Sequence, residues 1–435
     1  MQRISRRTFA ERMARAGVGA SAFTIIQPQL VRGAGKEKLK AGVVGCGGRG
    51  TQAVADLLIG TENTEVIAMG DVFKDKLDAS LKRLKANARV TERVLVDPEH
   101  QFVGFDAYKK VINSGVDIVM LCTPPGYRPE HFEACVEGKK HVFCEKPFGT
   151  DPVGVKRFMA AARKSERLRL TVVTGAQRRF SPDYMETVKK IQDGAIGDVV
   201  ALYAYWIGGP VIQQKGRDPK LSDMEWQHRN WYSFVWICGD QVVEQHLHNI
   251  DVCNWVMGMH PEKVVASGGC AWRPREELYG NIYDHVSADF VYPNGVHMSS
   301  HCRQFRGPDI YRHVGELVVG SKGRSNCRDL GTGTGQDVRD AFRDPLESPY
   351  VREHVAMVNS IRGDGPYLNH AMAVAESTMT CIMAREAAYS GQEITWDEVM
   401  ASNLDLQPKA FAWDAKVAVP PLPVPGQYRF VSFPR

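Results

Sequence analysis

The stretch AGVVGCGGRGTQA, residues 41–53, contains the pattern G-x-G-x-x-G at Gly45, Gly47 and Gly50. A short apolar, β-rich run leads into it, and apolar residues at helical spacing follow it. Glycines in this context permit a tight turn and a close backbone approach, and the N–H groups of the helix start attract a pyrophosphate. A plain glycine-rich turn is the alternative. We expect a dinucleotide-binding loop whose contacts come from Gly45, Gly47, Gly48, Arg49 and Gly50.

An acidic residue, Asp71, lies near the end of the second predicted strand, TEVIAMGDV, residues 64–72. A carboxylate at this place accepts the ribose hydroxyls of NAD and repels the 2′-phosphate of NADP. Lys74 lies three residues further on and keeps NADP open as a second possibility. The sequence therefore predicts NAD as the cofactor, with NADP as the alternative.

Predicted strands alternate with predicted helices through residues 36–180, which is typical of βαβ units and a parallel sheet. Beyond Pro182 the pattern changes to alternating strands, with a hairpin expected to turn at Pro293-Asn294-Gly295. We expect an α/β fold, with an N-terminal Rossmann domain (36–180) followed by an α+β domain with an open, mostly antiparallel sheet (181–400). The Pro-rich residues 401–435 form a C-terminal tail that we expect to be extended.

The N-terminal segment, residues 1–35, resembles a twin-arginine export signal. ISRRTF, residues 4–9, carries Arg6-Arg7 and Phe9, and the apolar residues 16–26 that follow are too short to span a bilayer comfortably. A weak amphipathic helix and an uncleaved anchor are the alternatives. The resemblance implies a periplasmic or cell-envelope protein that meets the membrane only transiently, during export of the folded chain.

Composition excludes several classes of protein. The 435 residues are 43% hydrophobic and 24% charged with a net charge of +5, and no basic block interleaved with aromatics occurs, so nucleic acid is a poor candidate partner. The ten cysteines contain no C-x-x-C pair and are scattered through apolar runs. We expect them to be buried free thiols and not a disulfide framework.

The tripeptide Glu145-Lys146-Pro147 directly follows another predicted strand of the parallel sheet. Ligands of open α/β sheets bind at the carboxyl ends of the strands, so a lysine there could meet both a nicotinamide and a substrate hydroxyl. Its positive charge would favour a developing alkoxide. A surface lysine in a turn is the alternative.

These motifs together resemble the Gfo/Idh/MocA family, named for glucose–fructose oxidoreductase and inositol dehydrogenase. The resemblance rests on the glycine loop, Asp71, CTPPGYRPEHFEACVEGKKHVFCEKP and GAQRRF, and it runs from about residue 39 to about residue 394. It implies a Rossmann domain, an open mixed sheet, and NAD(P)-dependent oxidation or reduction of sugars, inositols and related polyols. It also places Thr123, Pro124, Glu145 and Lys146 beside the cofactor. We further expect a tightly bound cofactor and a homo-oligomer, dimer or tetramer.

The family's third motif, Asp, His and Asp at fixed spacing, is matched by Glu244, His248 and Asp251 within VVEQHLHNIDVCNW. If residues 241–257 form one helix, these three side chains share a face with Trp255. The resemblance then makes His248 the acid/base, with Lys146 polarising the substrate oxygen and Glu244 orienting the histidine or holding a neighbouring hydroxyl. Glutamate replaces the usual aspartate at 244, and His246 stands where many members have glycine, which leaves the substrate class open.

Further candidates for substrate contact are Trp231, in the aromatic stretch MEWQHRNWYSFVWICGD, and Arg178, at the end of the last predicted Rossmann strand. Core packing and pairing with acids are their respective alternatives. Only Glu244 and His248 could share a metal ion on one helix, and because no third ligand is evident we expect no metal. The main functional alternative to a dehydrogenase is an NAD-dependent glycoside hydrolase or lyase that oxidises its sugar transiently. A non-catalytic sugar sensor is a third class.

Overall fold

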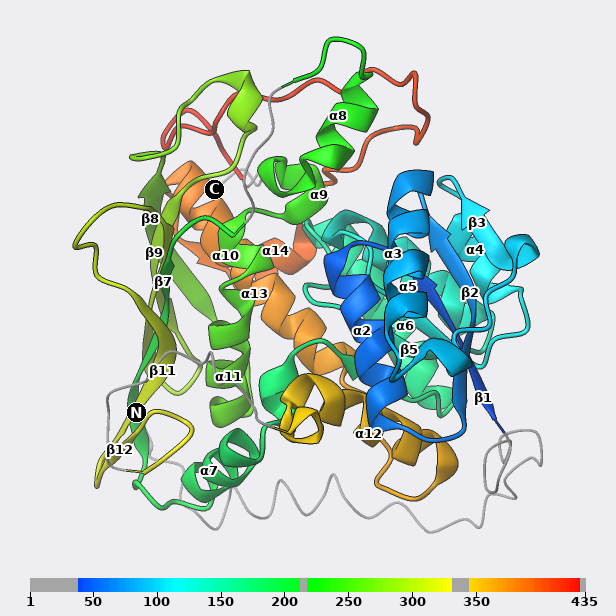
Figure 1. The fold of residues 1–435 in the computed structure, drawn as a ribbon. Helices are drawn as coiled ribbons and strands as arrows, with labels where there is room; N and C mark the ends of the chain where they lie inside the picture. The colour runs from blue at the N-terminus through cyan, green and yellow to red at the C-terminus, as the bar shows by residue number, and fades with distance from the viewer. Residues whose placement is uncertain (1–37, 212–216, 331–343, 431–435) are drawn as a thin grey trace.

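Six parallel strands form the first sheet of the structure, a computed structural model that describes residues 38–211, 217–330 and 344–430. The strand order is β3-β2-β1-β4-β5-β6, and helices connect successive strands on both faces (Figure 1). The central strands β1 and β4 are almost wholly apolar, as expected where both faces of a sheet are covered. The strands are β1 (Leu39–Val44), β2 (Thr64–Asp71), β3 (Gln101–Val103), β4 (Ile118–Leu121), β5 (His141–Cys144) and β6 (Val172–Thr174). The helices are α2 (Gly48–Gly60), α3 (Lys74–Ala86), α4 (Ala107–Ile112), α5 (Arg128–Glu137) and α6 (Pro152–Arg167).

The second sheet has seven strands in the order β12-β11-β7-β10-β9-β8-β13. β10 pairs with β7 in parallel, and the other pairs are antiparallel. The predicted Rossmann domain and the predicted mostly antiparallel sheet are both confirmed, as is the hairpin turn, where Gly295 has φ +81°. The strands are β7 (Val199–Gly208), β8 (Lys263–Gly269), β9 (His285–Val291), β10 (His297–Gln304), β11 (His313–Gly320), β12 (Arg324–Ser325) and β13 (Ile394–Thr395).

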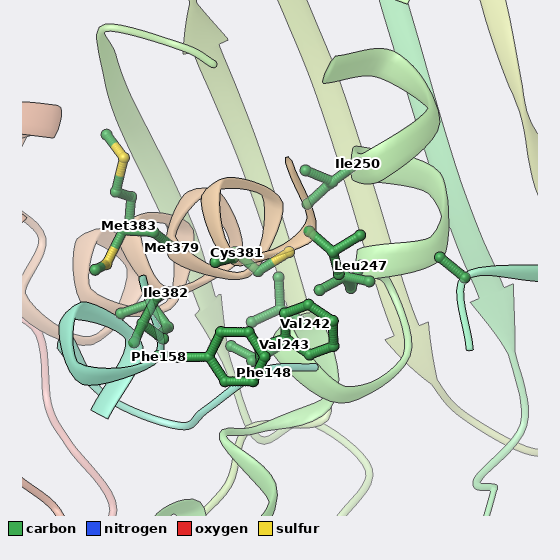
Figure 2. Close-up of a cluster of buried hydrophobic side chains, with 14 of the residues drawn as sticks. Phe148, Phe158, Val242, Val243, Leu247, Ile250, Met379, Cys381, Ile382 and Met383 are labelled. Atoms are coloured by element: carbon green, nitrogen blue, oxygen red, sulfur yellow. The ribbon is translucent and has the colours of Figure 1, made fainter. Parts of the chain in front are cut away.

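Helices fill the space between the second sheet and the Rossmann domain (Figure 1). Side chains from α6, α10, α11, α13 and the loop before α6 form a common hydrophobic core there, which includes Phe148, Phe158, Leu247 and Ile382 (Figure 2). The helices of the second half are α7 (Pro182–Gln192), α8 (Asp223–Arg229), α9 (Val235–Cys238), α10 (Gln241–Glu244), α11 (Leu247–Met257), α12 (Pro349–Arg362), α13 (Ala371–Ser390) and α14 (Trp396–Ala401).

One helix of the second half, α12, packs against the Rossmann domain. At Gly60, the last residue of α2, an added Cβ would lie 2.6 Å from Val351 of α12, so only glycine fits this crossing. Met357 and Val358 of α12 join the hydrophobic core beneath β1 and β4. Residues 349–362 therefore pack as part of the Rossmann domain, although they follow most of the second domain in the sequence.

The ten cysteines are unpaired, and all except Cys122 and Cys270, which are partly buried, are fully buried, as the sequence predicts. Over the described ranges, no helix is long and apolar enough to cross a membrane. The predicted export signal lies in residues 1–35, outside the part of the chain that the structure describes.

Candidate active site

The glycine loop joins β1 to α2 at the carboxyl edge of the first sheet. Gly45 has φ +95°, and an added Cβ there would lie 2.6 Å from backbone atoms of Cys122 and Thr123. At Gly50 an added Cβ would lie 1.9 Å from the carbonyl oxygen of Gly45, whereas at Gly47 and Gly48 it would meet nothing within 4 Å. The loop is thus packed on its inner side and open on its outer side.

The first turn of α2 has no side-chain cap and no acidic residue. Its N–H groups therefore have no intrahelical or capping partner and carry the positive end of the helix dipole. Together with the open backbone at Gly47 and Gly48, this arrangement fits the pyrophosphate of a dinucleotide.

Asp71 ends β2 next to this loop. Its Oδ2 accepts from the N–H of Cys46 at 2.6 Å and its Oδ1 from the N–H of Phe73 at 2.8 Å. Burial raises the pKa of Asp71, and the two backbone hydrogen bonds oppose that rise. A carboxylate has about four acceptor positions, so two bonds leave capacity for ribose hydroxyls. Lys74 instead pairs with Asp78 at 2.7 Å on the exposed side of α3.

Arg49 turns its side chain inward, away from the open side of the loop. Its guanidinium bonds to Glu145, lies 3.3 Å from Asp56 and lies 3.2 Å from Glu353 of α12. These carboxylates raise its pKa against the effect of burial. The predicted cofactor contact of Arg49 is therefore left to its backbone, while its side chain ties α2 to the residues after β5 and to α12.

Thr123 and Pro124 follow β4, and Glu145 and Lys146 follow β5, so all four lie at the same sheet edge as the loop. The backbone of Thr123 packs directly against Gly45. The sequence-predicted cofactor residues are thus brought together at one edge.

Lys146 and Glu244 form a buried ion pair between the two domains. The ammonium lies 3.2 Å from Glu244 Oε1 and also bonds to the backbone carbonyl of Glu244. Both side chains are less than a tenth exposed. Burial raises the pKa of Glu244, and the charge of Lys146 acts against that rise.

His248 lies close enough to Lys146 for the lysine charge to affect the pKa of the imidazole. Burial, reinforced by the charges of Lys146 and Arg178, holds the pKa of His248 well below its usual range, so the imidazole is neutral near pH 7. Its Nδ1 and the Oε2 of Glu244 find no hydrogen-bond partner among the described residues, although both are buried. Unpartnered buried polar atoms are costly unless a ligand satisfies them. A neutral base, a cation and a carboxylate oxygen here can serve a substrate bearing several hydroxyl groups.

The prediction of one helix over residues 241–257 is wrong: α10 ends at Glu244, and α11 begins at Leu247. The carbonyl of Gln241 accepts from the N–H of both Gln245 and His246, at 3.0 and 3.2 Å, which widens the turn as in a π-bulge. His246 is fully buried and its Nε2 lies 2.7 Å from Ser300 Oγ on β10. The hydrogen bond of His246 to the sheet, away from the cleft, accompanies the break.

The other predicted substrate residues are engaged elsewhere. Arg178 forms a buried ion pair with Glu316, and Asp251 accepts two bonds from Arg179 at 2.8 Å and one from Ser377 at 2.8 Å. Trp231 is partly buried against the hydrophobic cores. The geometry thus supports pairing with an acid for Arg178 and core packing for Trp231, and Asp251 is paired with Arg179.

Two residues of the site region escape prediction from the motifs. Trp206 of β7 stacks on His248, with ring centroids 5.8 Å apart and planes at 24°. Alternation along β7 fixes which residues share its face, but not which face meets the cleft. Glu353 is fully buried against Arg49, and no local pattern signals a partner 304 positions away.

No group of three or more His, Cys, Asp or Glu side chains in the described ranges is arranged to hold a metal ion. The strand order, the uncapped start of α2 and the acid ending β2 define an NAD-binding Rossmann protein with a second domain built on a mixed sheet.

The chain belongs to the GFO/IDH/MocA oxidoreductase family. The family's NAD-binding Rossmann fold model matches residues 39–174, and its C-terminal domain model matches residues 184–325, together more than half of the chain. Myo-inositol 2-dehydrogenase of Thermotoga maritima is 24% identical over 230 residues, covering 53% of this chain and 58% of the relative. Inositol 2-dehydrogenase of Rubrobacter xylanophilus is 23% identical over 339 residues, covering 76% and 85%. The chain spans about half the length of the first curated relatives it matches.

Solved structures share the fold. Apo scyllo-inositol dehydrogenase from Lactobacillus casei aligns with a TM-score of 0.63 at 20% identity, covering 83% of this chain and 98% of that one. The same enzyme with bound NAD(H) and scyllo-inositol aligns with a TM-score of 0.61 at 19% identity, covering 82% and 99%. At this identity the likeness establishes the architecture of both domains.

Proposed function

We propose that the protein is an NAD-dependent oxidoreductase that transfers a hydride between a CH–OH group of an inositol, sugar or related polyol and a nicotinamide. The observation that carries the proposal is the buried Lys146–Glu244 pair beside neutral His248, with unpartnered Nδ1 and Oε2 atoms. The inositol dehydrogenases among its relatives support the substrate class.

In this proposal each side chain has a separate role. Lys146 donates a hydrogen bond to the reacting oxygen, which lowers the cost of its developing negative charge. His248 takes the hydroxyl proton at Nδ1, which has no partner among the described residues, and its depressed pKa keeps the imidazole uncharged before the reaction. Glu244 Oε2 accepts from a neighbouring hydroxyl and so orients the ring. When bound, the nicotinamide supplies the hydride acceptor.

Gly45, Gly47, Gly48 and Gly50 would hold the pyrophosphate, and Asp71 the adenine ribose, which favours NAD over NADP. We further propose that the cofactor is tightly bound, that the protein forms a dimer or tetramer, and that the twin-arginine segment directs the folded chain to the periplasm or cell envelope. The Arg6-Arg7 pair and the apolar run behind it support the last of these.

The test mixes the purified protein with a panel of inositols, aldoses and linear polyols and follows NADH absorbance, with NAD added to one series. We expect at least one compound to reduce the bound NAD, seen as a rise in NADH absorbance of up to about one equivalent per chain. No NADH with any member, together with release of the aglycone from chromogenic glycosides, would replace the proposal with transient-redox cleavage.

A further inference from the structure

An aromatic cluster joins the C-terminal tail to the Rossmann domain. Trp413 stacks on Phe73, with ring centroids 5.3 Å apart and planes at 29°, and packs on Phe105 at 4.6 Å. His228 of α8 meets the edge of Trp413 at 5.9 Å. Four segments that are separate in the sequence therefore meet at one place.

This place lies beside Asp71. Phe73 follows Asp71 by two residues and donates its N–H to Asp71 Oδ1. Phe105 follows Gly104, and the N–H of Gly104 donates to the backbone carbonyl of Asp71 at 3.0 Å. The aromatic cluster therefore borders the carboxyl edge of β2 and β3. That edge is where the adenosine half of a dinucleotide is held when an acid ends β2.

A residue of the second domain also contacts Phe73. The guanidinium of Arg229, the last residue of α8, lies 4.1 Å from the Phe73 ring centroid and 3.3 Å from Asp75 in the first turn of α3. Phe73 is thus contacted by both Trp413 and Arg229, and neither belongs to the Rossmann domain. A stacked ring and a cation both restrict the rotamers that Phe73 can adopt.

The tail is fastened on both sides of Trp413. Gln407 donates to Thr150 Oγ1 at 3.1 Å before it, and the carbonyl of Val417 accepts from Gln227 of α8 at 2.6 Å after it. Further along, Tyr283 donates to the carbonyl of Pro423 at 2.7 Å. The tail runs beside α8 above the start of α3 (Figure 1), so it bridges the two domains at this edge.

We propose that the C-terminal tail completes the adenosine end of the cofactor site. Trp413 is a positioning residue that fixes Phe73 and, through the Phe73 N–H, the carboxylate of Asp71, and the tail must move before the cofactor leaves. This inference rests on the proposed cofactor binding and adds that residues outside the Rossmann domain control cofactor release.

The test compares the wild type with Trp413→Ala, Trp413→Phe and the control Trp272→Ala, whose side chain is 48% exposed in the second domain. Each full-length protein is loaded with NADH, and release is followed by NADH fluorescence after mixing with excess NAD. We expect release from Trp413→Ala to be about tenfold faster or more, since the contacts of Trp413 with Phe73, Phe105 and His228 are lost. Release from Trp413→Phe stays near the wild-type rate because a ring remains, and Trp272→Ala matches the wild type.

Equal release rates from Trp413→Ala and the wild type, even with a lowered melting temperature, would overturn the inference and leave cofactor binding intact. Failure of the proposed function looks different, because the wild type itself would then bind no NADH. If Trp413→Ala does not fold, Arg229→Gln removes the cation from Phe73. Faster NADH release from Arg229→Gln supports the proposal that contacts from outside the Rossmann domain fix Phe73 and slow cofactor release. An unchanged rate refutes it.

Discussion

Lys146 contributes more to this site than a positive charge. Its ammonium bonds to both the carboxylate and the backbone carbonyl of Glu244, so it joins the loop after β5 to the end of α10. The same charge helps to keep His248 neutral. One lysine thus links the two domains beside His248 and adds to the effect of burial, which is the main cause of the low pKa of that histidine.

Loss of either proposed catalytic side chain should abolish most of the turnover while the fold persists. We expect Lys146→Ala and His248→Ala each to lower kcat by ~10²–10⁴-fold on a verified substrate, the usual effect of losing one positioned acid/base group. Matched controls are Lys82→Ala and His297→Ala, both at exposed positions. Near-normal rates in both site variants, with circular dichroism unchanged, would remove these residues from the mechanism.

Asp71 should set the choice between the two nicotinamide cofactors. Asp71→Ser keeps an acceptor oxygen for the Cys46 and Phe73 N–H groups but removes the charge that repels a 2′-phosphate. We expect the ratio of the Kd for NADP to the Kd for NAD to fall by a factor of about 10 to 100, since a hydrogen bond to a charged group contributes ~1.5–3 kcal/mol. Calorimetric titration measures both constants, with exposed Asp193→Ser as the control. A wild type that binds NADP more tightly would mean that a cation such as Lys74 dominates.

At the scale of elements, helix α5 carries a buried histidine whose protonation should make the free energy of unfolding depend on pH. His131 stacks on Tyr108 at 4.0 Å, and burial lowers its pKa to about 3, from an ordinary value of 6.5. Below pH 6.5 the unfolded chain takes up a proton that the folded chain refuses, so this contribution to stability is present above pH 6.5 and is lost as pH falls toward 3.

His131→Phe should therefore make stability less dependent on pH. Between pH 7 and pH 5 we expect the free energy of unfolding of the wild type to fall more steeply than that of His131→Phe, because a tenfold difference in proton affinity between the folded and unfolded chains corresponds to ~1.4 kcal/mol. Urea denaturation at several pH values measures both slopes. His297→Phe, at an exposed position, is the control, and equal slopes for wild type and His131→Phe would assign the loss to other groups.

Elements of this chain differ in how far the sequence determines them. The β1–α2 unit was predictable because glycine spacing, helical periodicity and the terminal acid all act within about thirty residues. The break between α10 and α11 was not predictable, because it accompanies a hydrogen bond between His246 and Ser300 on β10, and no local periodicity signals that contact. Arg178 and Asp251 match motif positions, yet their partners, Glu316 and Arg179, decide their roles.

At the scale of the whole molecule, the proposed site draws on the entire chain. The loop at Gly45, the lysine at 146, the acid at 244 and the aromatic residue at 413 lie in four separate segments, and α12 returns to brace α2 through Glu353. Such a site exists only after the chain has folded completely. A cofactor held there would be enclosed by both domains and the tail, which links the proposed cofactor site to the proposed route of export.

Replacing Arg6-Arg7 by Lys-Lys should separate folding from export. The twin-arginine route carries folded proteins, and NAD is made in the cytoplasm, so a chain of this kind would have to be loaded before it leaves. We expect the Lys-Lys variant to accumulate in the cytoplasm, folded and holding NAD(H). The wild type should be recovered from the cell envelope with about one NAD(H) per chain, retained through dialysis because dissociation is slow. Cell fractionation and nucleotide analysis after acid extraction measure both quantities.

A protein that keeps its cofactor indefinitely must also return the hydride in place, through a second substrate or a later step of the same reaction. Normal export of the Lys-Lys variant, or envelope protein that is free of cofactor and needs added NAD for each turnover, would break the connection between the N-terminal segment and the site.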